Sequence, residues 1–383
     1  MKNKRSKQEL TRLILTALIL GSGCLYGTVA EATDPKVVDE DMTTINASYP
    51  QYQMTCNTTN HYVTGNGNPT YVPIIINGVS SGTNGLTAYS FYGEHGHSTS
   101  ASGFGKITLN GGRLLNLAGC SSGVSPISYN KAYIHADVGT GTVYDNVTVD
   151  GSVYGGEATS SGNVHNNTVE INQQGGKTVT VNGDVYGGKA KNSSAGTQAD
   201  GGNAVTITGG HITGNIYGGW AGNQSWRNTV TISGGTFGDN TVVYGGYASQ
   251  GGGNNTVTIN KDVTLYGIIG TYKSSNDTYI TSGNKLYLGA SGNGIKIKDG
   301  GEGVGGFATV YITDKVNFSD GGKVLTTNKF FSSVEGNTPY VDVVGLKEKT
   351  TIGTMTLISS GTNLDGVGVA YNGPKNLDQY FIF

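Results

Sequence analysis

The amino-acid sequence predicts an all-β fold in which a single chain winds into a parallel β-helix, also called a β-solenoid. The first observation is a phrase that returns down the middle of the chain, an aliphatic residue followed by Tyr-Gly-Gly, at Val153–Gly156, Val185–Gly188, Ile216–Gly219 and Val243–Gly246. The tyrosines of successive copies lie 32, 31 and 27 residues apart. Self-similarity at such a period indicates stacked units that bury their apolar faces only against their neighbours.

The second observation is a phrase between these copies, Asn-Thr-Val-x-Ile, which occurs at Asn167–Ile171, Asn228–Ile232 and Asn255–Ile259, and with Ala204 in place of Thr at Asn203–Ile207. Alternation along a strand places Val and Ile on one face and Thr on the other. We interpret the glycine pairs that follow each Tyr as turn formers. Stacking then puts like on like, and we expect one column of tyrosines, made of Tyr154, Tyr186, Tyr217 and Tyr244.

Two weaker matches extend the pattern in both directions. Phe91–Gly93 is an early relative of the Tyr-Gly phrase, and Leu265–Gly267 is predicted to be a worn fifth copy. The solenoid is therefore expected to run from about residue 60 to about residue 360.

Composition supports an ordered solenoid and excludes other classes. The 383 residues include 64 Gly and 23 Tyr, 13% of them are charged, and the net charge is -2. Disordered chains usually combine high net charge with few aromatic residues, so disorder fits poorly. No stripe of Lys and Arg follows the first dozen residues, and we therefore predict no nucleic-acid partner.

Residues 1–32 have the features of a signal peptide. Basic residues precede the apolar run Leu13–Leu20, and the small-x-small sequence Ala30-Glu31-Ala32 follows, so cleavage is expected before Thr33. The apolar run is shorter than the ~20 residues that span a bilayer. The alternative is lipid attachment at Cys24. The signal predicts export, to the cell surface, the outer membrane or the medium.

The remainder of the chain divides into three parts. Residues 33–140 form a less regular β region that is expected to begin and cap the solenoid, because an uncapped end would expose unpaired strand edges. Residues 141–290 hold the regular repeats, and residues 291–383 form the end of the solenoid. The segments 309–313, 340–344 and 354–358 are predicted to be its last strands.

Loops of unequal length follow each Tyr-Gly-Gly phrase and are expected to emerge along one edge, at 157–166, 189–202, 220–227 and 247–254. Loops gathered on one face often mark a binding face. The aromatic residues Trp220, Trp226 and Tyr247 in these loops are candidate ligand contacts, and their alternative role is packing against the solenoid itself. Cys56 and Cys120 are either a disulfide pair or two buried thiols.

No pattern predicts a cofactor, a metal ion or catalysis. Glu94–His97 offers three potential ligands but lacks a fourth that can be placed nearby. Residues 301–306 match G-x-G-x-x-G, but a strand-like segment follows where dinucleotide binding needs a helix. Residues 234–239 match the calcium-binding nonapeptide only in part. The acids of the repeats form no column, whereas glycoside cleavage needs a carboxyl pair.

The signal peptide together with Val-Tyr-Gly-Gly-x-Ala and Asn-Thr-Val-Thr-Ile repeats resembles an adhesin-type autotransporter passenger, over residues 1–32 and about 140–360. The resemblance implies a right-handed β-helix that crosses an outer membrane and is displayed or released there. Such proteins end in a membrane β-barrel, yet only about 90 residues follow the repeats, too few for many ~10-residue barrel strands. The translocator is therefore expected to be a separate partner, or the gene to be truncated or split.

The function expected from the sequence is adhesin-like binding of a glycan or protein ligand on a cell surface, without catalysis. Two alternatives remain open. One is a secreted β-helix enzyme that degrades polysaccharide, and the other is a purely structural surface spacer.

Overall fold

The computed structural model of the chain contains two units, residues 1–33 and 34–383, and the described residues all belong to the second. They are the strands at 36–38, 52–57, 60–65, 74–76 and 90–95, followed by residues 105–123, 126–135, 145–290, 294–316, 321–331, 340–343, 355–362 and 368–371. The predicted signal peptide therefore lies outside the described residues.

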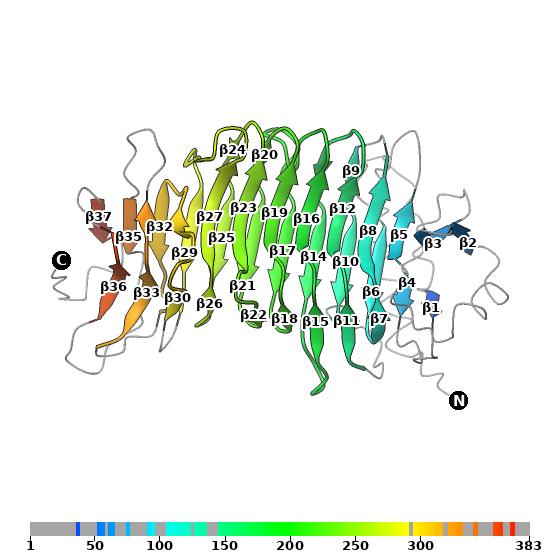
Figure 1. Cartoon of the computed structure of the whole chain (residues 1–383), viewed down its shortest axis with the longest axis horizontal. Coiled ribbons are helices and arrows are strands. Elements are labelled where there is room, and N and C mark those ends of the chain that lie inside the picture. Colours follow the sequence, from blue (N-terminus) through cyan, green and yellow to red (C-terminus); the bar gives the residue numbers. More distant parts are fainter. Residues whose placement is uncertain are drawn as a thin grey trace, which may run out of the picture. The chain divides into compact units, whose positions relative to one another are not determined.

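The Asn-Thr-Val-x-Ile segments form strands of one 12-stranded sheet, here called sheet A, in which all neighbours pair in parallel (Figure 1). Its strands, in spatial order, are β1 (Lys36–Val38), β4 (Ile74–Ile76), β6 (Lys106–Leu109), β10 (Lys131–Ile134), β14 (Thr168–Ile171), β17 (Ala204–Ile207), β21 (Thr229–Ile232), β25 (Thr256–Ile259), β29 (Lys285–Leu288), β32 (Thr309–Ile312), β35 (Tyr340–Val343) and β37 (Gly368–Tyr371).

The Tyr-Gly-Gly segments form the second parallel sheet, sheet B. Its parallel strands, in spatial order, are β5 (Ser90–His95), β8 (Asn116–Ser122), β12 (Val153–Ala158), β16 (Val185–Ala190), β19 (Ile216–Ala221), β23 (Val242–Ala248), β27 (Gly267–Lys273), β31 (Gly303–Gly305) and β34 (Phe330–Phe331). The short strand β28 (Thr278–Tyr279) pairs with β27 in the antiparallel sense.

Short strands between sheets A and B form a third face in two parallel groups. The first group is β7 (Gly112–Leu114), β11 (Val147–Val149), β15 (Val179–Val181), β18 (His211–Ile212) and β22 (Thr236–Phe237). The second is β26 (Thr264–Leu265), β30 (Ile295–Ile297), β33 (Lys323–Thr327) and β36 (Thr356–Ser360). Each coil of the chain thus passes from sheet A to the third face and then to sheet B, which confirms the predicted parallel β-helix.

Three smaller pairs complete the described strands. The first two are parallel, β9 (Ile127–Ser128) with β13 (Val164–His165) and β20 (Ser225–Trp226) with β24 (Gly252–Gly253). The third is the antiparallel hairpin of β2 (Tyr52–Asn57) and β3 (Asn60–Gly65). Bridges join Val164 to Ala195 and Ala195 to Ser225, so the segments that follow the sheet B strands share one edge, as expected.

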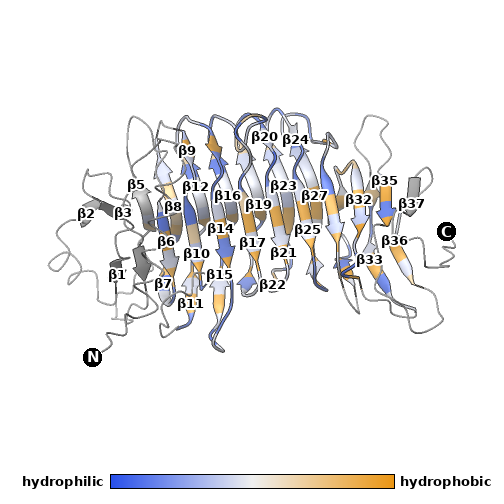
Figure 2. Cartoon of the chain, turned by 180° about the vertical axis from the view of Figure 1, so that it is seen from behind, coloured by the Kyte–Doolittle hydropathy of each residue, from blue (hydrophilic) through white to orange (hydrophobic). Residues whose placement is uncertain are grey.

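The core is a column of aliphatic side chains from all three faces. In β21, Val230 and Ile232 are fully buried, whereas Thr229 and Thr231 on the other face are half-buried. The same alternation recurs in β14, β17 and β25, and Figure 2 shows hydrophobic segments separated by hydrophilic turns. Because every coil repeats the pattern, Val and Ile stack on their equivalents and form one continuous cluster.

An asparagine ladder lies beside this core, at the corner that leads into sheet A. Its members are fully or almost fully buried and come from six successive coils, namely Asn130, Asn167, Asn203, Asn228, Asn255 and Asn284. From Asn167 onward, each side-chain oxygen accepts the backbone N–H of the asparagine one coil earlier, for example Asn203 N to Asn228 Oδ1 at 2.9 Å, and the Asn130 oxygen accepts that of Gly105. The ladder satisfies polar groups that burial would otherwise leave unpaired.

The two glycines of each Tyr-Gly-Gly phrase lie inside a strand and not in a turn, which corrects the sequence interpretation. A Cβ on Gly218 would lie 2.5 Å from the carbonyl oxygen of Gly245 on the next coil. A Cβ on Gly219 would lie 2.5 Å from Nδ2 of Asn228. The first glycine therefore permits contact between coils, and the second makes room for the asparagine ladder, which explains why the two phrases recur together.

The predicted fifth copy of the Tyr-Gly phrase is wrong. The register pairs Tyr244 with Ile269, so Ile269 occupies the tyrosine position, and Tyr266 lies between β26 and β27. Tyr92 of the early relative does join the column, although Ala118 separates it from Tyr154. The three segments predicted as the last strands are β32, β35 and β36, but β37 follows them at the end of sheet A. Sheets A and B already include strands within 33–140, so the parallel strand pairing of the solenoid begins before residue 141.

Candidate binding face on the outside of sheet B

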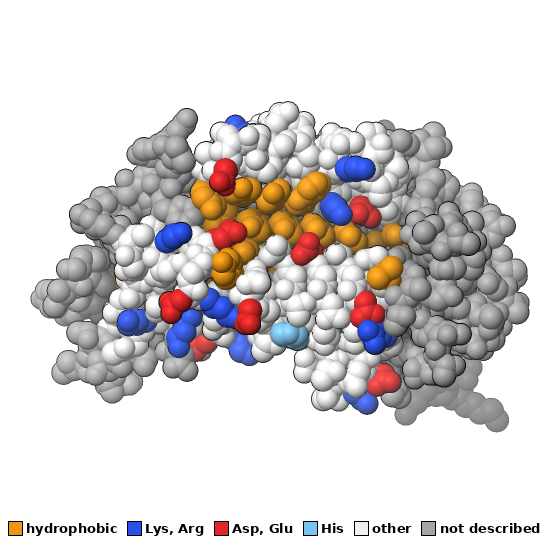
Figure 3. All heavy atoms as spheres, viewed as in Figure 1, with side chains coloured by type: hydrophobic (Ala, Val, Ile, Leu, Met, Phe, Trp, Pro, Cys, Tyr) orange, Lys and Arg blue, Asp and Glu red, His pale blue; other side chains and the backbone are white. Residues whose placement is uncertain are grey.

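The outer surface of sheet B carries the predicted tyrosine column. Val153 and its equivalents point into the core, so the next residue in each strand points outward. The rings of Tyr154, Tyr186, Tyr217 and Tyr244 are stacked at centroid distances of 5.1, 4.9 and 5.0 Å, with their planes within 6° of parallel. We call these four residues the tyrosine ladder. Figure 3 shows the resulting band of hydrophobic side chains across the face, with charged side chains along its borders.

A second outward column runs beside the tyrosine ladder, and its members differ from coil to coil. In register from β8 to β27 they are Ser121, Glu157, Lys189, Trp220, Tyr247 and Tyr272. The Tyr247 ring is perpendicular to the rings of Tyr217 and Tyr244, with centroid distances of 5.8 and 5.6 Å. It is within 10° of parallel to the Trp220 ring, at a centroid distance of 6.1 Å. Edge-to-face contacts of this kind add to the gain from burial. The second column therefore packs across the ladder and holds it in place.

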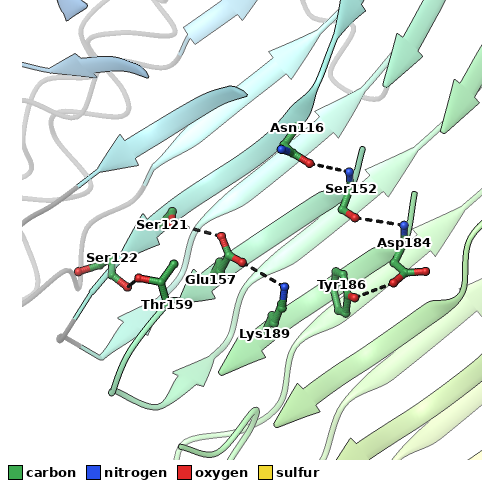
Figure 4. Close-up of polar contacts among 9 residues, drawn as sticks. All are labelled: Asn116, Ser121, Ser122, Ser152, Glu157, Thr159, Asp184, Tyr186 and Lys189. Atoms are coloured by element: carbon green, nitrogen blue, oxygen red, sulfur yellow. Dashed lines mark hydrogen bonds and ion pairs between the residues drawn. The ribbon is translucent and has the colours of Figure 1, made fainter. Parts of the chain in front are cut away.

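The N-terminal end of the second column is polar. The ammonium group of Lys189 lies 5.1 Å from the ring centroids of both Tyr154 and Tyr186, where the π-electrons attract it. Its Nζ is also 3.3 Å from Oε1 of Glu157, and Ser121 donates a hydrogen bond to the other oxygen of Glu157 at 3.3 Å (Figure 4). This charge is therefore balanced within the face.

A row of polar side chains lies at the start of the sheet B strands, beside the hydroxyl ends of the ladder rings. Asn116 accepts the N–H of Ser152 at 2.8 Å, Ser152 accepts that of Asp184 at 3.2 Å, and Asp184 accepts that of Asn215 at 2.7 Å. The Tyr186 hydroxyl donates to Oδ2 of Asp184 at 2.7 Å (Figure 4). Each side chain of this row bonds the backbone of the next coil at the corner, and Asp184 also accepts the hydrogen bond of the Tyr186 phenol.

Burial controls the ionisation of the face. The four ladder rings are only 6 to 9% exposed. Burial raises the pKa of Tyr154 to about 12, with the charge of Glu157 as the next cause. It also raises the pKa values of Tyr186 and Tyr244, where Asp184 and Glu302 respectively add to the effect. A phenolate would lose hydration next to a carboxylate, so the ladder stays neutral through ordinary alkaline pH.

Glu302 lies at the C-terminal end of the face. The Tyr244 hydroxyl donates to its two oxygens at 3.4 and 3.3 Å. Burial raises the pKa of this carboxyl group, the hydrogen bond from Tyr244 opposes the rise, and the charge of Asp277 adds to it. Glu302 is consequently the carboxyl group of this face whose protonated form burial favours.

The three predicted ligand-contact residues are only partly brought together. Trp220 and Tyr247 lie side by side on the candidate face, but within β19 and β23 and not in loops. Trp226 lies in β20 at the loop edge, where its Nε1 donates to Gln224 Oε1 at 3.2 Å and its ring covers Gly253. The predicted loop starts at 157, 189, 220 and 247 are wrong, because each strand continues to the following alanine.

Sequence reasoning missed the remaining members of the face. Glu157 and Lys189 were assigned to loops, and Tyr272 and Tyr279 were not singled out, although Tyr272 lies 5.1 Å from Tyr247 and 5.6 Å from Tyr279. The signal that could have found the first two is the fixed offset of each residue, three positions after the ladder tyrosine.

The three motifs considered for metal, dinucleotide and calcium binding can be located only in part on the described residues. Within the part of the chain that the structure describes, no group of three or more His, Cys, Asp and Glu could hold a metal ion. Glu94 and His95 end β5, with side chains outside the described set, and His97 lies outside it too. In the G-x-G-x-x-G segment, β31 is followed by strand β32, as predicted. Asp239 of the partial nonapeptide forms an ion pair with Lys298.

The cysteine pairing stays a prediction. Cys120 is buried in β8 in a cluster with Ile127, Ala158 and Val164. Cys56 belongs to β2, and its side chain lies outside the described residues.

Comparison of the chain with family models, with curated proteins and with solved structures finds no match in any of the three. Among the described residues, no helix is both long enough and apolar enough to span a membrane.

Proposed function

We propose that this chain is an exported, adhesin-like protein that binds a glycan or protein ligand on a cell surface through the outside of sheet B, without catalysis. The observation that carries the proposal is the continuous aromatic face formed by the tyrosine ladder and the second column. Tyr and Trp dominate the binding energy of many interfaces because they offer large, rigid contact areas with a polar tip.

The form of the face suits adhesion. Trp220, Tyr247, Tyr272 and Tyr279 are partly exposed and pack against the buried tyrosine ladder, so their positions are fixed before a ligand arrives. A preformed surface loses less conformational entropy on binding. Display of many copies on one cell would further raise the avidity of a weak contact. Export and display at the cell surface or release from it, with a separately encoded outer-membrane translocator, belong to the same proposal.

The carboxylates along the solenoid support a non-catalytic role. Asp150 forms a bidentate pair with Arg113 at 2.8 and 2.9 Å, and Glu157 pairs with Lys189. Each of these carboxylates is held in a structural contact between neighbouring coils, whereas a general acid or base has to be free to reach a substrate.

One observation favours the alternative of a polysaccharide-degrading enzyme. Glu302 has a raised pKa, and the charge of Asp277 contributes to the rise, so the two carboxyl groups interact at one end of the aromatic face. A carboxyl group with a raised pKa close to a second carboxyl group is an arrangement that glycoside cleavage can use. If E302Q removed a hydrolytic activity of the purified chain while leaving its binding intact, the enzyme would replace the adhesin as the conclusion.

The direct test is attachment of purified residues 33–383 to cells and to arrayed glycans. The double variant Trp220→Ala and Tyr247→Ala should reduce attachment at least tenfold. The matched control, T231A with T258A, changes two half-buried residues on the outer face of sheet A and should leave attachment unchanged. Equal attachment by both variants would favour the spacer.

Export has its own test. N-terminal sequencing of the chain recovered from the surface or medium of the producing cell should begin at Thr33. A chain that keeps Met1 would contradict this part of the proposal.

A further inference from the structure

The C-terminal end of the candidate face brings two partly exposed tyrosines into contact across neighbouring coils. Tyr247 of β23 and Tyr272 of β27 are paired in register. Their ring centroids are 5.1 Å apart, and their planes are inclined by 36°. Both rings are more exposed than those of the tyrosine ladder, so a small oxidant can reach them.

One of the two phenols already has a proton acceptor. The Tyr272 hydroxyl donates to Oδ1 of Asp277 at 2.7 Å. Oxidation of a neutral phenol is easiest when the proton leaves with the electron, and a carboxylate at hydrogen-bond distance accepts it without rearrangement. This contact therefore lowers the barrier to forming the Tyr272 radical.

The chain has few other ways to join its coils covalently. It contains 23 tyrosines and three cysteines, one of which lies in the predicted signal peptide. Among the described residues, the coils are held by backbone ladders, side-chain ladders, ion pairs and apolar packing. A bond between β23 and β27 would add a covalent constraint at one end of the face.

We propose that Tyr247 and Tyr272 form an oxidative cross-linking site, at which a one-electron oxidant from the extracellular medium joins β23 to β27 through a dityrosine bond. Each phenol gives one electron to the oxidant and releases its hydroxyl proton, and Asp277 accepts the proton of Tyr272. The two radicals form a carbon–carbon bond between ring positions next to the oxygens. The ring hydrogens at the new bond then move to the oxygens and restore both phenols, so the net loss is two electrons and two protons.

The aromatic contacts around the pair explain why this position is favoured over the rest of the face. Tyr247 also contacts Trp220, Tyr217 and Tyr244, so an electron removed from any of these rings can be replaced through Tyr247. The ladder tyrosines are buried and near parallel, which restricts the rotation that a biaryl bond requires. The product should therefore form outside the ladder, at Tyr272 and its nearer neighbour Tyr247 at 5.1 Å, ahead of Tyr279 at 5.6 Å.

The test uses purified residues 33–383 and a photogenerated ruthenium(III) tris-bipyridyl oxidant, with dityrosine fluorescence and peptide mass spectrometry as readouts. The main product should be a link between the peptides that contain Tyr247 and Tyr272, lighter by two hydrogen atoms. Y272F and Y247F should each lower that product at least tenfold, with unchanged circular dichroism, and D277N should slow its formation several-fold.

Two controls separate the proposal from simple proximity. Tyr287 and Tyr311 on sheet A are stacked at 4.5 Å and 10°, and neither hydroxyl donates to a carboxylate within the described part of the chain. A faster link there than between Tyr247 and Tyr272 would overturn the proposal. So would an equal yield of the Tyr247–Tyr272 link in urea-unfolded protein, or an unchanged rate in D277N.

Discussion

Replacement of Asn228 by alanine tests the asparagine ladder at its centre. The side chain is fully buried and accepts hydrogen bonds from N and Nδ2 of Asn203 at 2.9 and 3.0 Å. It also donates to the carbonyl oxygen of Ala195, to Ser225 Oγ and to Asn255 Oδ1, each at 3.0 Å. N228A removes all five contacts at once.

The loss of unfolding free energy in N228A depends on which hydrogen-bond partners of Asn228 keep another bond. Nδ2 of Asn203 still donates to the Val164 carbonyl, and the Ala195 carbonyl still accepts the N–H of Trp226. The backbone N–H of Asn203 is left without its acceptor in the interior. The orphaned buried donor costs about 1–3 kcal/mol and each of the other four bonds lost about 1 kcal/mol net, so the unfolding free energy should fall by about 5–7 kcal/mol.

The assay is urea unfolding of residues 33–383, followed by tryptophan fluorescence, because Trp220 in β19 and Trp226 in β20 lie just before Asn228 in the chain. Stability in a solenoid is a sum over coils and their interfaces, so tryptophan fluorescence from the coils next to the substitution is the relevant signal. The control T231A changes a half-buried residue on the outer face of the same strand and should cost at most about 1 kcal/mol. A midpoint shift in N228A no larger than that in T231A would refute the role given to the ladder.

Three further predictions follow from individual positions. G219A should destabilise the chain by at least about 2 kcal/mol, because its Cβ would lie 2.5 Å from Asn228 Nδ2, whereas G123A, with open space around it, should be neutral in the same urea assay. R227N should raise the free energy of unfolding by about 0.5–1 kcal/mol, because Arg227 has a φ of 57° where equivalent coils carry Asn166 and Asn254; an unchanged or lower urea midpoint would contradict this. Unfolding free energy should fall as pH rises from about 10 towards 12, because unfolded tyrosines ionise near pH 10 while burial raises the pKa of Tyr154 to about 12; pH-independent urea midpoints over that range would contradict it.

The sequence predicted the repeating architecture because identical side chains must meet on adjacent coils. The tyrosine column and the stacked asparagines follow directly from the two phrases and the strand periodicity. The fifth copy is wrong because the letters Leu265-Tyr266-Gly267 repeat while the register does not, and Ile269 takes the outward position of the ladder tyrosines. A repeated three-letter motif does not reveal a shift in strand register when the segment before the strand changes length.

The candidate face was predicted in part, for a reason that lies in the glycines. A Gly-Gly pair usually indicates a turn, so Trp220 and Tyr247 were placed in loops. Here the pair permits close approach between coils, and the strand continues through it. That continuation is what brings Trp220 and Tyr247 together and leaves Trp226 at the loop edge. The sequence alone does not distinguish a glycine needed for conformation from one needed for space.

The measurement that tests the central claim most directly is a hydroxyl-radical footprint of residues 33–383, free and attached to cells. The account predicts that attachment protects Trp220 and Tyr247 on sheet B, while the exposed Tyr340 of sheet A remains equally reactive. Protection confined to Trp226 and Tyr129 near the loop edge, with Trp220 and Tyr247 unchanged, would contradict it and move the binding surface to the loops.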